Sequence, residues 1–337
     1  MGDGRGIETA AKSIAGDRLR ALKHADGLVS AVLEVGGLSP EDAAALQARV
    51  RAAVETAPGV SAVRIVTTAD RRPEPAAAKP AAPAPAAPRP DRVIAVASGK
   101  GGVGKSTVSA NLAIALARIG RRAGLLDADI HGPSAPMLLG LTGRARLEAG
   151  LIAPLSAHGI AVLSMGLMAD PGRAVAWRGP MASSAFKQML DNADWSGIDT
   201  LVIDMPPGTG DITLTLAQQV KPDGVVIVST PQDLALIDAE RALNLFQELG
   251  TPILGFVENM ASFRCPCCGT ETRIFGEGGV ERAAAELGLP VLARLPLDPA
   301  LRAASDAGTP QPSGHFDALA HRVMERLEVL DEADVRR

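Results

Sequence analysis

The chain has 337 residues, of which 47% are hydrophobic and 21% charged, with 35 glycines and 25 prolines. This composition is typical of a soluble globular protein with one large or two unequal domains, and it excludes disorder throughout. A formal net charge of −4 gives no global reason to bind nucleic acid, and no apolar run is long enough to span a membrane. Because the chain also starts without an apolar secretory segment, we expect a cytoplasmic protein that binds neither nucleic acid nor a membrane.

The first part of the chain predicts a small α/β domain over residues 1–71. Residues 28–34 and 60–66 are apolar, β-rich runs that predict strands. Between them, Ser39 followed by Pro-Glu-Asp predicts a helix N-terminus, and an amphipathic pattern continues over residues 43–57. Residues 72–91 are rich in Pro and Ala without an apolar period, which indicates an extended, polyproline-like linker.

The rest of the chain, residues 92–337, alternates apolar β-rich runs with stretches of helical period. Such alternation is typical of an α/β fold with a mainly parallel central sheet flanked by helices. Strands buried on both faces read as continuous Val/Ile/Leu runs, and ligands bind at their carboxyl ends. The predicted strands are residues 93–97, 123–126, 160–164, 201–203, 225–228, 253–257 and 291–295.

A glycine-rich loop follows the first of these strands and matches G-x-x-x-x-G-K-[ST]. Successive backbone N–H groups in such a loop wrap phosphate oxygens, and the helix predicted over residues 107–119 adds its positive end. Lys105 would neutralise β/γ-phosphate charge and Ser106 would hold Mg²⁺. The predicted nucleotide-binding residues are Gly99, Lys100, Gly101, Gly102, Val103, Gly104, Lys105, Ser106 and Thr107. The motif predicts the P-loop NTPase class of α/β fold.

The same loop also fits the dinucleotide pattern G-x-G-x-x-G through Gly99, Gly101 and Gly104. Asp127 ends the next strand at the expected separation, so an NAD site is a real alternative. A charged Lys105 in the first helical turn favours the phosphate loop, since a dinucleotide fold packs that turn against the sheet. A Gly-rich turn with surface lysines is disfavoured by the strand before the motif and the helix after it.

Acidic residues follow two further predicted strands. Asp204 directly follows the predicted strand 201–203, and at this position it can organise Mg²⁺ through its water shell. Asp127 and Asp129 follow the predicted strand 123–126. We prefer Asp129 as the acid that orients the attacking water. An aspartate at a strand end is also a common helix cap, and His131 nearby is more often structural than a proton shuttle.

All three cysteines lie within residues 265–268, in the sequence Cys-Pro-Cys-Cys-Gly. Proline and Gly269 shape a tight turn in which the Cys265 and Cys268 sulfurs converge while Cys267 points elsewhere. A tetrahedral thiolate site or a [4Fe–4S] cluster usually needs four ligands, so one chain offers half a site and a C₂ dimer would complete it. A redox C-x-x-C, a zinc knuckle completed by a partner, and a Cys267–Cys268 disulfide are the competing interpretations.

Together these segments resemble the Mrp/ApbC family of iron–sulfur cluster carrier P-loop ATPases over residues 92 to about 312. The shared motifs are GKGGVGKST, DADIHGPS, WRGP, DMPPGTGD, VENM and CPCCG. The resemblance implies that Lys100 reaches the nucleotide of a second subunit and that Asp129 is the switch I acid. It also implies a metal-associated role for Asp204, an adenine contact for Asn259 with residues 296–298 nearby, and cluster ligation by Cys265 and Cys268.

The function implied by the resemblance is a slow ATPase that binds a [4Fe–4S] cluster across a homodimer interface and transfers it to apo-proteins. Client iron–sulfur proteins and cluster-assembly proteins would be its partners. The first domain resembles the small SufT-like domain of bacterial relatives but lacks cysteine. A MinD/ParA-type positioning ATPase without a cluster remains an alternative, as does an electron donor like the nitrogenase iron protein. The mixed charge of residues 316–337 is unlike a membrane-binding tail.

Overall fold

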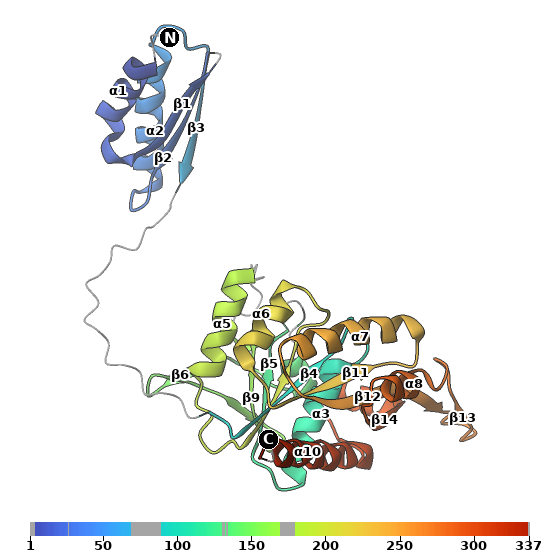
Figure 1. Cartoon of the computed structure of the whole chain (residues 1–337). Coiled ribbons are helices and arrows are strands. Elements are labelled where there is room, and N and C mark those ends of the chain that lie inside the picture. Colours follow the sequence, from blue (N-terminus) through green and yellow to red (C-terminus); the bar gives the residue numbers. More distant parts are fainter. Residues whose placement is uncertain are drawn as a thin grey trace. The chain divides into compact units, whose positions relative to one another are not determined.

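The computed structural model describes residues 4–25, 27–68, 89–129, 132, 134–168 and 179–335 (Figure 1). The chain divides into two compact units, residues 1–81 and residues 82–337, which are described separately below. His131, Trp177 and Arg178 lie outside the described residues. Among the residues that are described, no helix is long and apolar enough to cross a membrane.

The first unit is a three-stranded sheet with two helices. Antiparallel pairing joins β1 to β2 and parallel pairing joins β2 to β3. Ile7 and Val54, from the two helices, pack on Val29 and Leu33 of β2. The Ser39 Oγ accepts a hydrogen bond from Asp42 N, as the cap pattern predicts. The elements are α1 (Gly4–Ala15), η1 (Gly16–Arg18), β1 (Leu19–Ala25), β2 (Leu28–Glu34), α2 (Pro40–Glu55) and β3 (Ala62–Thr68).

Three elements of this unit, α1, η1 and β1, were not predicted. β1 has the sequence LRALKHA, whose charged and polar residues interrupt the apolar alternation that identifies a strand. It forms because it pairs with β2, whose buried face supplies the driving force. α1 begins in a glycine-containing stretch, and its two fully buried positions, Ile7 and Ala11, are one turn apart.

The second unit is built on a mainly parallel sheet, as predicted. Its strand order is β13-β12-β11-β4-β10-β5-β9-β8, and β14 also pairs with β12. The pairings of β13 and β8 are antiparallel and the other pairings are parallel. The strands are β4 (Arg92–Ala97), β5 (Ala123–Asp127), β8 (Leu155–Ala157), β9 (Ile160–Ser164), β10 (Thr200–Asp204), β11 (Gly224–Ser229), β12 (Ile253–Arg264), β13 (Glu271–Thr272) and β14 (Val291–Leu297).

Helices cover both faces of this sheet (Figure 1). Ala95 and Ala97 of β4 face a core that includes Phe186 and Phe246, whereas Ile94 and Val96 face the opposite core. The first face is covered by α5 (Gly179–Asp191), α6 (Asp211–Val220), α7 (Asp233–Glu248) and α8 (Gly279–Glu286), and the second by α3 (Lys105–Arg118) and α10 (Gly314–Val335). The remaining elements are α4 (Ala135–Leu138), α9 (Pro299–Asp306), η2 (Met165–Leu167) and the hairpin β6 (Arg146–Glu148) with β7 (Leu151–Ala153).

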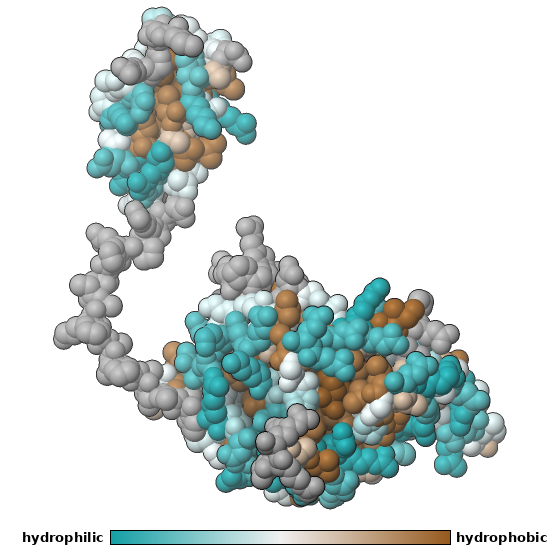
Figure 2. Space-filling view, viewed as in Figure 1, coloured by the Kyte–Doolittle hydropathy of each residue, from teal (hydrophilic) through white to brown (hydrophobic). Residues whose placement is uncertain are grey.

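The last helix, α10, is part of the core. Phe316, Leu319, Val323 and Leu327 are all buried in the core that α3 also lines, so this apolar face is already covered. In Figure 2, hydrophilic residues surround the hydrophobic ones on the face shown of this unit. The packing of α10 therefore differs from that of a tail available for membrane binding.

Candidate functional site

The candidate nucleotide site lies at the carboxyl end of three adjacent strands. β10 lies between β4 and β5, and Asp204, its last residue, is in register with Asp127 at the end of β5. The glycine-rich loop leaves the end of β4 beside them. Parallel pairing thus brings together three segments that are far apart in the sequence, as expected for a ligand site of this sheet type.

Close packing explains two glycines of the loop. A Cβ on Gly99 would lie 1.9 Å from the Asp238 backbone of α7, which no side chain permits. Gly104 has φ +83°, and a Cβ there would lie 2.2 Å from Nδ2 of Asn259. Gly101, in contrast, has nothing within 4 Å of its Cβ position, so the loop presents an open surface there.

Lys105 is the first residue of α3, yet it is only 5% exposed. Its Nζ donates a hydrogen bond of 2.6 Å to Oδ1 of Asp204, and Ser109 Oγ donates another of 2.8 Å to the same oxygen. Ser106 Oγ lies 3.4 Å from the Lys105 Nζ. Ser109 was not predicted, although its position one helical turn after Lys105 is a usable signal.

Asp204 leaves one acceptor unused. It is 1% exposed, and its Oδ2 is buried without a hydrogen-bond partner. A buried, unpaired carboxylate oxygen is costly unless a ligand completes it. Carboxylate and hydroxyl oxygens with water are the ligands that Mg²⁺ prefers, so Asp204 and Ser106 fit the predicted metal. This arrangement also accounts for a lysine in the first helical turn, which the NAD interpretation left without a role.

Asp127 organises the loop that follows β5. Its carboxylate accepts hydrogen bonds from Asp129 N at 3.0 Å, Ala135 N at 3.1 Å and Ser164 Oγ at 3.0 Å. Burial and the nearby Asp204 charge raise the pKa of Asp127 to about 7, whereas the backbone N–H groups act in the opposite direction. Asp129 is half-buried, and its Oδ1 accepts a hydrogen bond from Gly132 N at 3.2 Å.

Lys100 is half-exposed, and its carbonyl accepts a hydrogen bond of 2.9 Å from Ser98 Oγ. No hydrogen bond or ion pair engages its ammonium group within the described part of the chain. This differs from Lys105, whose charge is already matched by Asp204. The two lysines of the loop therefore differ: Lys105 is buried and paired with Asp204, whereas Lys100 is half-exposed and its ammonium group can contact another molecule.

A second cavity, of about 190 Å³, adjoins the loop. Its walls come from the start of α3, from β12, from the end of β14 and from α9. The phosphate loop, Asn259 and residues 296–298 therefore meet at this cavity. Asn259 Nδ2 donates a hydrogen bond of 2.8 Å to Val103 O, which ties β12 to the loop. The lining includes Gly104, Thr107, Asn259, Pro296, Asp298 and Leu301.

The three cysteines lie at the tip of a hairpin formed by β12 and β13. β12 is longer than predicted, because after Glu258 it leaves the fully buried part of the sheet and continues into this hairpin. Cys265 N donates to Thr270 O at 2.9 Å and Gly269 N to Cys265 O at 2.8 Å, with Gly269 at φ +72°. This is the tight knuckle that the sequence predicts.

The thiols of the knuckle are accessible. Cys265 is half-buried, Cys267 and Cys268 are exposed, and all three are free, so the vicinal disulfide is not formed. Cys268 Sγ lies 3.3 Å from Thr270 Oγ1, and hydrogen bonds from Thr270 to the thiolate lower the pKa of Cys268. Across the described ranges, no three His, Cys, Asp or Glu side chains gather as a metal site. The knuckle alone is therefore an incomplete site.

The fold and the phosphate loop define the class of protein, a P-loop NTPase. Residues 89–328 match the family described as "ParA: NUBPL iron-transfer P-loop NTPase". An iron–sulfur cluster carrier protein of Pseudomonas fragi is 51% identical over 221 residues, which cover 65% of this chain and 77% of that protein. The chain belongs to this family of iron–sulfur cluster carrier P-loop NTPases, which confirms the resemblance found in the sequence.

Solved structures agree with this assignment. A nucleotide-binding protein from Archaeoglobus fulgidus in complex with ADP has a TM-score of 0.59 and 40% identity, covering 65% of this chain and 87% of that one. The cell division ATPase MinD of Pyrococcus furiosus has a TM-score of 0.53 at 24% identity, covering 70% of this chain and 99% of its own. The likeness to MinD shows a shared fold alone, so the positioning-ATPase alternative gains no support from it.

Proposed function

We propose that this carrier binds and slowly hydrolyses ATP with Mg²⁺, holds a [4Fe–4S] cluster as cargo between two copies of the chain, and transfers it to apo-proteins. The observation that carries the proposal is one chain with a complete phosphate site and half of a thiolate site. Clients and cluster-assembly proteins are the partners of such a carrier. The three free thiols suit the reducing cytoplasm, where we place it.

The phosphate site supplies positioning and charge. Residues 99–107 surround the phosphates, Lys105 moves its charge from Asp204 to the β/γ-phosphates, and Ser106 with Asp204 holds Mg²⁺. Asp129 then orients the attacking water. Once Lys105 faces the phosphates, the Asp204 carboxylate would be free to hold Mg²⁺ together with Ser106, and the metal would supply positive charge at the phosphate oxygens.

The adenine lies in the cavity between the loop, β12 and residues 296–298, where β14 ends and α9 begins. Asn259 is the predicted contact, and its Nδ2 is held by Val103 O in this structure. Its Oδ1 therefore remains as an acceptor for the adenine amino group. This assignment places the base next to Gly104, where a side chain would obstruct Asn259.

Lys100 acts in a second subunit. Its ammonium group is not engaged within the described part of the chain, and we propose that it reaches the nucleotide of the facing copy, as an arginine finger does. The variant Lys100→Ala should then lose ATP hydrolysis and ATP-dependent dimerisation while it still binds nucleotide. Normal hydrolysis by this variant would contradict the assignment.

The cluster takes two thiolates from each copy, Cys265 and Cys268. Anaerobic reconstitution with iron and sulfide, followed by measurement of both per dimer, tests this directly. Cys265→Ser and Cys268→Ser should lose the cluster, and Cys267→Ser is the matched control that should keep it. A colourless wild-type protein, or cluster retention in the Cys265→Ser/Cys268→Ser double variant, would contradict the proposal.

We further propose that residues 1–71 form the small domain, residues 72–91 the linker and residues 92–337 the ATPase and carrier domain. All candidate site residues belong to the last of these. The small domain has no cysteine, so the thiolate ligands of the cluster come from the carrier domain.

A further inference from the structure

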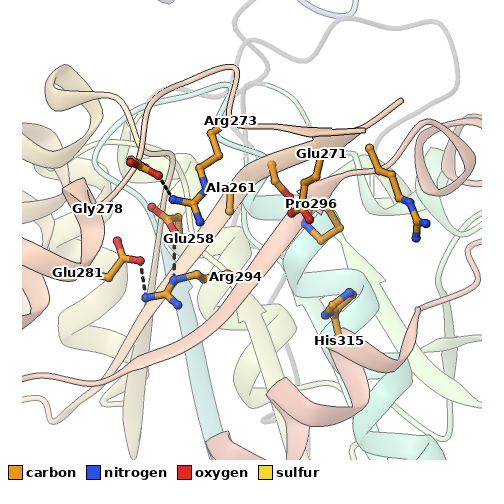
Figure 3. Close-up of a pocket in the computed structure, with 12 residues that line it drawn as sticks. Glu258, Ala261, Glu271, Arg273, Gly278, Glu281, Arg294, Pro296 and His315 are labelled. Carbon is orange, nitrogen blue, oxygen red and sulfur yellow. Dashed lines mark ion pairs between the residues drawn. The ribbon is translucent and has the colours of Figure 1, made fainter. Parts of the chain in front are cut away.

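A cavity of about 350 Å³ lies beside the cysteine hairpin (Figure 3). It shares Pro296 with the cavity next to the phosphate loop, and its other lining residues are different. β12, β14, α8 and the hairpin supply its walls, and Arg264 and Glu271 in its lining are paired across β12 and β13, directly before and after the knuckle. Since a water molecule occupies about 30 Å³ of liquid, this volume equals roughly ten waters, which is ample for one long side chain.

Glu258 is the unusual residue of this cavity. It is a glutamate only 3% exposed, and its Oε1 is buried without a hydrogen-bond partner. Arg294 approaches it, but the Nε to Oε2 distance of 3.5 Å is long for a hydrogen bond. Burial, followed by the charge of Glu281, raises the pKa of Glu258. The cavity therefore contains a carboxylate that the protein itself does not satisfy.

The other charges of the cavity also call for a cation. Glu281 pairs with Arg294, and its Oε2 is a second buried acceptor without a partner. Arg273 pairs with Glu277. Figure 3 shows Glu258, Glu281 and Arg294 pointing toward one another, with Arg273 above them. The cavity is lined by four carboxylates, three guanidinium groups and the imidazole of His315, so the carboxylates outnumber the guanidinium groups by one: Glu258, Glu271, Glu277, Glu281, Arg264, Arg273, Arg294 and His315.

The two carboxylate oxygens without a hydrogen bond, Glu258 Oε1 and Glu281 Oε2, are acceptors, so a ligand that satisfies them must be a hydrogen-bond donor. A guanidinium group carries five N–H donors in a planar fork and bridges two carboxylates well. A metal ion fits less well, because no three metal-binding side chains gather among the described residues. On the loop that carries Arg273, the next residue, Ile274, is 53% exposed and offers an apolar contact near the rim.

We propose that this cavity is a docking socket for an arginine side chain of the protein that exchanges the cluster with this carrier. The inference rests on the proposed carrier function. An arginine seated against Glu258 and Glu281 would place its protein beside Cys265 and Cys268. Recognition and transfer would then occur at neighbouring points of one hairpin, and the socket would select acceptors that carry arginine near their own ligands.

The test uses the full-length protein with alanine methyl groups labelled by ¹³C, so that Ala261 in the cavity wall reports binding. The probe is the capped tripeptide Gly-Arg-Gly, and its neutral isostere carries citrulline in place of arginine. We expect saturable shifts with the arginine peptide that weaken in salt, and none with citrulline. Binding of both peptides alike, or of neither, would overturn the proposal.

Variants identify the carboxylates responsible. Glu258→Gln and Glu281→Gln should each weaken binding of the arginine peptide about tenfold, since each removes one of the two carboxylate charges that face the guanidinium group. Glu277→Gln is the matched control: it lines the same cavity but is paired with Arg273 and exposed, so affinity should stay within about twofold. Equal affinity in all three variants would contradict the assignment.

The outcome is independent of the carrier function, because the titration needs neither nucleotide nor cluster. A second measurement excludes the other occupant, a basic side chain of a second copy. Sedimentation with Mg²⁺ and a non-hydrolysable ATP analogue should give the same dimer fraction for wild type and Glu258→Gln. If the variant alone fails to dimerise, the socket belongs to the subunit interface and the proposal is wrong.

Discussion

At the scale of single residues, Lys105 and Asp204 determine the state of the site before nucleotide binds. Their 2.6 Å ion pair is almost fully buried, so each charge is desolvated and depends on the other. Ser109 adds a second donor to the same oxygen. The pair prevents either charge from being buried alone and keeps both ready for exchange with phosphate and metal.

Removal of one partner should therefore be more harmful than removal of both. Lys105→Met leaves Asp204 as an unpaired buried charge, and we expect the free energy of unfolding to fall by about 3–5 kcal/mol. The double variant Lys105→Met/Asp204→Asn should recover a large part of that loss, and we expect neither variant to hydrolyse ATP. Urea unfolding of the nucleotide-free proteins measures both values, and equal stability of the two variants would contradict the coupling.

Asp127 predicts a pH dependence of stability. Its pKa, raised from 3.8 to about 7, means that the folded state binds more protons than the unfolded state between these values. The contribution of Asp127 is therefore fully present below pH 4 and is lost as the pH rises through 7, by about 1.4 kcal/mol per pH unit within the window.

Asp127→Asn removes this contribution but also disturbs three hydrogen bonds, so the slope is the diagnostic and not the absolute stability. Denaturant unfolding at several pH values from 4 to 8 should show stability falling less with pH in the variant than in the wild type. Carboxylates with lowered pKa, such as Asp191 and Asp199, are present in both proteins and cancel in the comparison. Parallel curves would show that Asp127 ionises normally.

At the scale of elements, β12 connects the sites. Within one strand it carries Glu258 in the socket, Asn259 on the phosphate loop and, after Met260 at φ +58°, the approach to Cys265. A non-glycine residue in the left-handed region marks a local constraint. The strand therefore changes direction between the sheet and the hairpin while Asn259 holds it against the loop.

Asn259→Ala should release that attachment. We expect the free energy of unfolding to fall by about 1 kcal/mol, which is typical for one hydrogen bond, and nucleotide affinity to fall as well. Amide hydrogen exchange should accelerate in residues 103–106, next to the lost contact. The Cys265 amide is the internal control, because its bond to Thr270 O does not involve Asn259, and faster exchange there alone would refute this view of the strand.

At the scale of the whole molecule, the chain combines two units with separate cores. Each unit buries its own apolar residues, and the first consists of a single sheet and two helices. The candidate nucleotide site, the knuckle and the socket all belong to the second unit. The chemistry of the carrier is therefore expected to survive without the first unit.

A chain shortened to residues 89–337 tests this expectation. It retains the ion pair of Arg89 with Asp191 and every candidate ligand. It should bind ATP with unchanged affinity and reconstitute the same amount of iron per dimer as the full chain. Loss of the cluster in the shortened chain would assign the small domain a direct part in cluster binding, against the absence of cysteine from its sequence.

Elements with a local pattern could be predicted from the amino-acid sequence. The apolar runs identified the parallel strands, because strands buried on both faces contain little else, and G-x-x-x-x-G-K-S identified the loop. The cysteine knuckle was also predictable from the sequence, since Pro266 and Gly269 define its turn within five residues. β1 and α1 were missed, because pairing and packing with their neighbours stabilise them more than their own pattern does.

Contacts between residues that are far apart in the sequence are visible in the tertiary structure alone. Strand order places β10, which ends at Asp204, between β4, which leads into the glycine-rich loop, and β5, which ends at Asp127. No spacing in the sequence encodes that order. Ser109 and Ser164 acquire their roles through contacts with these acids, and Glu258 becomes a buried, unsatisfied carboxylate because β12 and β14 bring Arg294 close but not close enough. Burial and partnership are properties of three-dimensional packing, so a local pattern names the chemical groups while the fold decides which of them remain free to act.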